Sequence, residues 1–130
     1  MRIIRVVVLE PDLFRRDLMA DLIESNDLVC VTKEDAADPS VDDLGESSEA
    51  VFVVDLEQED GEGVQALRAI RELPEECQPR VVGVARRSTR ASIAANEGLR
   101  CEEYVDLPLD TGEFVRAVAR QSLEAVLAAD

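Results

Sequence analysis

Carboxylate side chains stand directly after two apolar runs of the sequence. Glu10 follows the run at residues 3–9, with Asp12 two positions further on, and Asp55 follows the run at residues 51–54. If these runs are neighbouring strands of a parallel sheet, their carboxyl ends meet at one edge and the acidic groups converge. Such oxygen ligands suit a divalent cation. A single carboxylate at a strand end is ordinarily a solvated loop residue. Two at one edge make a functional site about as well supported as two solvated loop residues.

Other kinds of catalytic chemistry lack their usual residues. The chain contains no histidine, so the commonest general base and the usual zinc ligand are both missing. Its three cysteines, Cys30, Cys77 and Cys101, form no close pair and predict neither a disulfide framework nor a metal motif. We therefore expect no enzyme and assign no catalytic residue.

The net charge limits the partners. Asp and Glu number 29 against 14 Lys and Arg, which gives a formal net charge of −15. Such a surface repels phosphate backbones and anionic lipid, which argues against nucleic-acid and membrane partners. A basic partner surface, or a salt-rich cytoplasm, suits it better. The apolar stretch at residues 6–9 is too short for a signal peptide, and a cytoplasmic location is expected.

Apolar runs alternate with helical periodicity along the chain. Strands are expected at residues 3–9, 28–31, 51–54, 81–84 and 103–105. Helices are expected at residues 13–25, 63–73 and 88–96, and from a capping box at residues 110–113 to about residue 128. This alternation predicts an α/β fold with a doubly wound, five-stranded parallel sheet and helices on both faces. We expect one domain over residues 1–130.

Two local features of this pattern can be checked separately. Gly98 follows the helix at residues 88–96 and is expected to close it as a C-cap glycine. Residues 33–49 hold seven acidic residues and few aliphatic ones, so a short, poorly anchored helix is expected there.

The arrangement resembles the receiver domain of bacterial response regulators over essentially the whole chain. Asp55 after a Val-Phe-Val-Val strand, Gly63 at the start of the next helix, and Tyr104 followed by Leu107-Pro108 carry the resemblance. It implies a flavodoxin-like sheet with strand order 2-1-3-4-5. It also implies that Asp55 is the phosphoacceptor for a histidine kinase and that Tyr104 is the aromatic residue that moves during switching. The bond between Leu107 and Pro108 is expected to be cis, as in the family's Lys-Pro pair.

The chain departs from the family at four functional positions. Glu10 and Pro11 stand where the family has an acidic pair, and proline offers no ligand side chain. Ala85 replaces the Thr or Ser after the fourth strand, and Leu107 replaces the lysine after the fifth. These changes remove a hydrogen bond and a cation from the phosphoryl group, so efficient autophosphorylation is not expected.

Magnesium is therefore expected to bind weakly, if it binds at all. Glu10 and Asp55 are the candidate ligands, and a shift of the loop could add Asp12, whereas Mg²⁺ requires near-ideal octahedral geometry. Arg86 could lend positive charge or lie across the pocket, although a solvated arginine is the more ordinary interpretation. No other cofactor is expected.

Three functions remain open at this stage. The first is a degenerate receiver that works by protein–protein interaction, and the second is a receiver still phosphorylated on Asp55 by a histidine kinase. The third, a small flavodoxin-like enzyme or nucleotide binder, lacks the Ser/Thr/Gly-rich phosphate loop after the first strand. The expected partner is a histidine kinase or another signalling protein. A homodimer through the face of the fourth helix, fifth strand and fifth helix is also possible, near Ala95 and Val115 with Tyr104 as anchor.

Overall fold

The computed structural model describes residues 4–33, 50–57 and 61–129. The helix expected within residues 33–49 falls almost wholly outside the described residues. The elements follow one another in this order: β1 Arg5–Leu9, α1 Leu13–Glu24, β2 Val29–Lys33, β3 Ala50–Asp55, α3 Glu62–Arg71, η2 Glu75–Cys77, β4 Arg80–Ala85, α4 Arg87–Ala94, η3 Glu97–Leu99, β5 Glu103–Asp106 and α5 Thr111–Ala129. The expected strands and helices on the described residues are confirmed to within a few residues at their ends.

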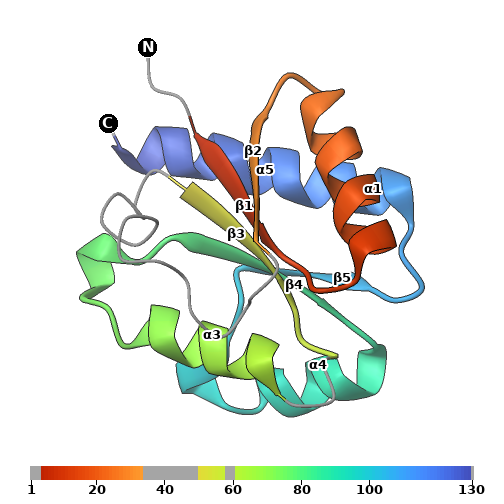
Figure 1. The fold of residues 1–130 in the computed structure, drawn as a ribbon. Helices are drawn as coiled ribbons and strands as arrows, with labels where there is room; N and C mark the ends of the chain where they lie inside the picture. The colour runs from red at the N-terminus through yellow and green to blue at the C-terminus, as the bar shows by residue number, and fades with distance from the viewer. Residues whose placement is uncertain (1–3, 34–49, 58–60, 130) are drawn as a thin grey trace.

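The five strands among the described residues form one parallel sheet in the order β2-β1-β3-β4-β5. Figure 1 shows α1 and α5 over one face of this sheet and α3 and α4 over the other. The doubly wound fold and the 2-1-3-4-5 strand order are therefore confirmed. Strands β1, β3 and β4 lie inside the sheet, which explains why their sequences are continuous apolar runs.

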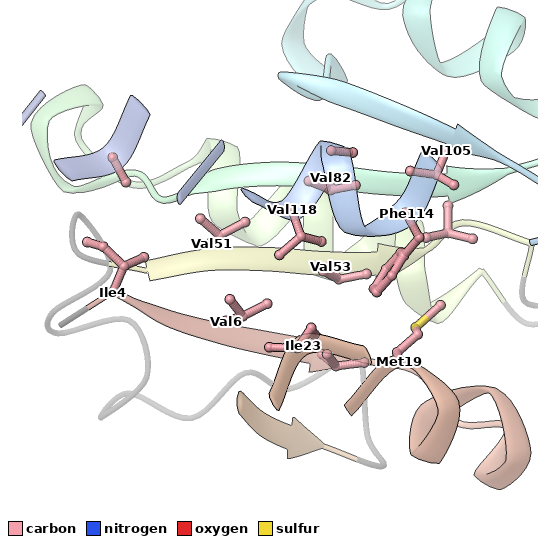
Figure 2. Close-up of a cluster of buried hydrophobic side chains, with 14 residues drawn as sticks. Ile4, Val6, Met19, Ile23, Val51, Val53, Val82, Val105, Phe114 and Val118 are labelled. Carbon is pink, nitrogen blue, oxygen red and sulfur yellow. The ribbon is translucent and has the colours of Figure 1, made fainter. Parts of the chain in front are cut away.

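Alternate side chains of the inner strands pack into two separate hydrophobic cores. The core under α1 and α5, shown in Figure 2, takes Val6 and Val53 from the sheet and Phe114 from α5. The core under α3 and α4 takes the intervening strand residues, among them Val7 and Phe52. Because both faces are covered, valine side chains fill both, and the β-branched residues suit the strands.

Gly63 allows α3 to approach the sheet closely. A Cβ atom at this position would lie 1.8 Å from the backbone oxygen of Asp55, the last residue of β3. No side chain larger than hydrogen fits there without moving the helix. Gly63 thus sets the distance between α3 and the strand end that carries Asp55.

The helix ends follow the predicted capping only in part. Asp110 accepts a hydrogen bond from the backbone N–H of Glu113 at 2.9 Å, so the expected cap at the start of α5 is confirmed. The expectation that Gly98 closes α4 is wrong, because Gly98 lies in η3 and lacks the positive φ of a C-cap glycine. Instead, α4 ends at Ala94, and the Asn96 side chain accepts from the Gly98 N–H at 3.1 Å.

Candidate functional site

The acid pair lies where the sequence predicts it. Leu9 of β1 pairs with Val54 of β3, so the residues that follow, Glu10 and Asp55, stand together at the carboxyl edge of the sheet. Both are buried, with 1% of Glu10 and 5% of Asp55 exposed. Two carboxyl groups this close, away from water, cannot both ionise without a compensating cation.

The cation comes from the chain itself. Arg15, in the first turn of α1, donates from Nη1 to Glu10 Oε1 and to Asp55 Oδ2, at 2.9 Å in both cases. Its neighbour Arg16 is buried and donates to the backbone oxygen of Glu10 at 3.3 Å. Two consecutive arginines therefore fix the start of α1 to the edge of the sheet that carries the acid pair.

Arg15 was not predicted as a site residue, although the sequence contains a signal for it. The first turn of a helix is the positive end of its macrodipole, so cations there are unfavourable unless an acidic group lies nearby. Arg15 and Arg16 both occupy the first turn of α1, which has no acidic residue of its own. An acidic partner from elsewhere in the fold was therefore to be expected.

The ionisation of the pair is strongly altered. Burial raises the pKa of Glu10 from 4.5 to about 8, the hydrogen bond and charge of Asp55 add to this rise, and Arg15 opposes it. Burial acts to lower the pKa of Arg15, but the charges of Glu10 and Asp55 outweigh it and raise that pKa. The environment of the pair therefore favours a proton on Glu10, while Arg15 contacts both residues.

Asp55 is also bound at its second oxygen. Oδ1 accepts from the backbone N–H of Glu57 at 2.8 Å, and Glu57 Oε1 in turn accepts from the backbone N–H of Arg86 at 2.7 Å. Glu57, which sequence analysis did not single out, thus links the ends of β3 and β4. Both carboxyl oxygens of Asp55 have protein partners.

Apolar side chains make up part of the rim beside the acid pair. Ala85 ends β4 and is buried, and its backbone oxygen accepts from the N–H of half-buried Leu107 at 3.1 Å. The bond between Leu107 and Pro108 is cis, which confirms the prediction. A cavity of about 310 Å³ lies here, lined by Arg15, Arg86, Leu107, Pro108 and Leu109.

Solved structures with the same fold include receiver domains and response regulators. The receiver domain of a Francisella response regulator superposes with a TM-score of 0.75 at 14% identity, over 92% of this chain and 97% of that one. The structure titled FixJ-N gives 0.77 at 16% identity, over 95% and 96%. A chemotaxis response regulator of Vibrio cholerae gives 0.74 at 9% identity, over 92% and 98%. The chain has the receiver-domain fold.

The likeness to receiver domains rests on structure alone. No family model matches the chain, and no curated protein matches it either. With identities this low, the receiver fold is what the solved structures establish. Among the described residues, no helix is long and apolar enough to cross a membrane.

The residues at the acidic edge of this receiver fold do not fit Mg²⁺. Glu10 and Asp55 already share Arg15, and Pro11 has no ligand atom in its side chain. Asp12 is exposed at the N-cap of α1, and no described contact brings its side chain to the pair. Across residues 4–33, 50–57 and 61–129, no three acidic, cysteine or histidine side chains gather into a metal site.

Tyr104 is half-buried and held in place on the receiver fold's β5. Its hydroxyl accepts from the backbone N–H of Cys101 at 3.1 Å, and the Arg90 guanidinium lies 5.5 Å from the ring centre. The ring also packs against Gly83, because a Cβ atom at Gly83 would lie 3.2 Å from Cδ1 of the Tyr104 ring. Burial raises the pKa of Tyr104. The ring therefore packs partly against the sheet and presents only part of its surface outward.

Proposed function

We propose that the chain is a degenerate receiver domain in intracellular signal transduction, which acts through protein–protein contact without an efficient phosphorylation switch. One observation carries the proposal: apolar Ala85 is buried at the end of β4, beside the strand that ends in Asp55, and apolar Leu107 lines the cavity together with Arg15. Neither side chain can donate a hydrogen bond or a positive charge to a phosphoryl group. Phosphoryl transfer depends on positioning and charge neutralisation, and each lost group of this kind typically costs about 3 kcal/mol of transition-state stabilisation.

The hydrogen bonds of Asp55 support the same conclusion. Its Oδ2 accepts from Arg15 and its Oδ1 from the backbone of Glu57. A phosphoryl donor must compete with one of these bonds before the carboxylate can attack. This cost adds to the loss of stabilising groups around the transferred phosphoryl group.

The alternative is a receiver that a histidine kinase still phosphorylates on Asp55. The observation in its favour is the cavity, because Arg15 and Arg86 line it together with Leu107. Two guanidinium groups could supply some of the positive charge that a leucine in place of lysine removes.

A small phosphodonor separates the two functions. The protein is incubated with acetyl phosphate or phosphoramidate and excess Mg²⁺, and its intact mass is measured over time. We expect no appreciable population with an added phosphoryl group. If wild type gains one group and Asp55→Asn gains none, the phosphorylated receiver becomes the better description.

A protein partner would find an exposed apolar surface on α1. Leu13, Phe14 and Leu18 are 55%, 86% and 42% exposed. Phe14 and Leu18 lie one helical turn apart, with the exposed acidic residues Asp17 and Asp21 beside them. A signalling protein, such as a histidine kinase, with a basic and apolar contact surface would complement this face.

The face of α4, β5 and α5 is the surface proposed for a homodimer. Tyr104 exposes part of its ring on this face, and the exposed ring surface is smaller than that of a freely exposed anchor residue. Sedimentation equilibrium tests the proposal on wild type, Tyr104→Ala, Phe14→Ser and Asp55→Ala. A dimer that only Tyr104→Ala dissociates would support this face, and one that only Phe14→Ser dissociates would assign it to α1. Loss of the dimer in Asp55→Ala would contradict a function independent of the switch.

A further inference from the structure

We propose that Arg15 is a built-in cation that occupies the acid pair in place of a divalent metal ion and thereby keeps metal ions out. The inference deepens the proposed function and rests on it only in treating this edge of the sheet as the former switch site. It explains how the acid pair persists in the core although no metal ligand set accompanies it.

The geometry is that of a cation shared between two carboxyl groups. A single nitrogen, Nη1 of Arg15, lies 2.9 Å from an oxygen of Glu10 and 2.9 Å from an oxygen of Asp55. Both oxygens belong to buried residues on adjacent strands. A divalent ion that bridged these two residues would have to share this space with Nη1, so the two cannot be bound together.

The tethered cation has two advantages over a free ion. It is part of α1, so its local concentration is high and independent of the solution. A guanidinium is also weakly hydrated and always charged, whereas Mg²⁺ gives up its water reluctantly. An ion that displaced Arg15 would remain next to a positive charge on a side chain that is only 32% exposed.

The protein also holds Arg15 in position from its backbone. The Arg16 side chain donates to the backbone oxygen of Glu10, and the Arg16 N–H donates to the backbone oxygen of Asp12 at 2.8 Å. These bonds fix the first turn of α1 against the end of β1. Arg15 is thus directed at the acid pair by a rigid helix end, which lowers the entropy lost in forming the contact.

Removal of Arg15 should therefore create a metal site. Mn²⁺ is the probe, because electron paramagnetic resonance measures the free ion directly. We expect wild type to show no saturable binding at about 1 mM Mn²⁺. Arg15→Ala should bind one ion with a dissociation constant at least about tenfold below this concentration. Arg15→Lys keeps a tethered cation and should resemble wild type.

Two controls separate this site from the acidic surface. Arg116→Ala removes an exposed arginine near the start of α5, with the same change in net charge, and should bind no more Mn²⁺ than wild type. The double variant Arg15→Ala with Asp55→Asn should lose the new site. If Arg15→Ala does not fold, as judged by its melting curve, Arg15→Gln replaces it, because glutamine keeps a polar group at the acid pair.

The outcomes also distinguish the two proposals. The built-in cation would be overturned if wild type binds Mn²⁺ saturably, or if neither Arg15→Ala nor Arg15→Gln binds Mn²⁺ better than Arg116→Ala. Either outcome would leave the phosphodonor result unaffected. If wild type accepts a phosphoryl group while Arg15→Ala gains a metal site, the built-in cation stands and the phosphorylation-independent function fails.

Discussion

Glu10 shows at the scale of one residue how folding changes a side chain's chemistry. The carboxyl group of Glu10 lies next to Asp55, and its Oε2 atom is buried without a hydrogen-bond partner among the described residues. Ionisation of this group would place a second negative charge beside Asp55 in a buried site, which burial and the charge of Asp55 both disfavour. Its carboxyl group therefore keeps its proton until about pH 8.

The pH dependence of stability should report this carboxyl group. Its pKa is 4.5 ordinarily and about 8 in the folded protein, so the folded state holds the proton more tightly. Its contribution to stability is complete below the lower value and is lost as pH rises through the upper one. Glu10→Gln should therefore melt several degrees above wild type at about pH 9 and lose part of the decline with pH.

Thermal denaturation followed by circular dichroism across this pH range is the measurement. Glu124→Gln, an exposed position on α5, is the matched control and should follow the wild-type curve. An equal decline in Glu10→Gln and in wild type would show that Glu10 does not cause it.

Arg15 marks the limit of what the sequence reveals about single residues. Glu10, Asp55, Ala85 and Leu107 were placed in advance, because each stands next to the end of a strand and the strand determines its position. Arg15 has a long side chain on a helix, and many directions were open to it. Its partner depends on how α1 packs, which local sequence patterns do not specify.

At the scale of elements, α3 is fixed by contact with the end of β3. Gly63→Ala would place a methyl group 1.8 Å from the Asp55 carbonyl oxygen, and backbone cannot move aside as a flexible side chain can. We expect a loss of about 1–3 kcal/mol in the free energy of unfolding, measured by urea denaturation.

Gly112→Ala is the control for helix propensity. A Cβ atom there meets only side-chain atoms, those of Arg116 at 3.3 Å and of Asp110 at 3.4 Å, so its effect should be small. Equal losses in the two variants would mean that the close approach of α3 has no special cost.

The elements themselves were largely predictable from the sequence. Alternation of apolar runs and helical periods located them, and Asp110 located the start of α5. The way in which α4 ends was not predictable. Gly98 was expected to close the helix in a left-handed conformation, but the Asn96 side chain accepts a hydrogen bond there from the Gly98 N–H. Several residues suit a helix end, and their competition is settled only by local geometry.

The charge of the whole molecule is its most unusual property. A formal net charge of −15 on 130 residues favours expansion, because like charges repel in the compact state. Opposed to this are ion pairs between elements, such as Arg71 with Glu102 at 2.9 Å and Arg90 with Asp106 at 3.2 Å. Exposed pairs of this kind contribute little each, so repulsion should dominate.

Salt should therefore stabilise the protein. Raising KCl from about 0.05 M to about 1 M shortens the screening length to about 3 Å, and we expect the melting temperature to rise by several degrees. Equal rises in NaCl and KCl would indicate screening and not a specific ion. A melting temperature that falls with salt would show that ion pairs outweigh the repulsion.

The contact of Arg15 with Asp55 also links two regions thermodynamically. The same helical turn carries Arg15, which contacts Asp55, and the exposed Phe14, so we expect the order of this turn to be coupled to the state of Asp55. Coupling of this kind is reciprocal: if a protein that binds Phe14 stabilises the contact of Arg15 with Asp55, it lowers the affinity of Asp55 for any competitor of Arg15 by the same factor. A ligand at Asp55 that expels Arg15 must in turn weaken the grip of that protein.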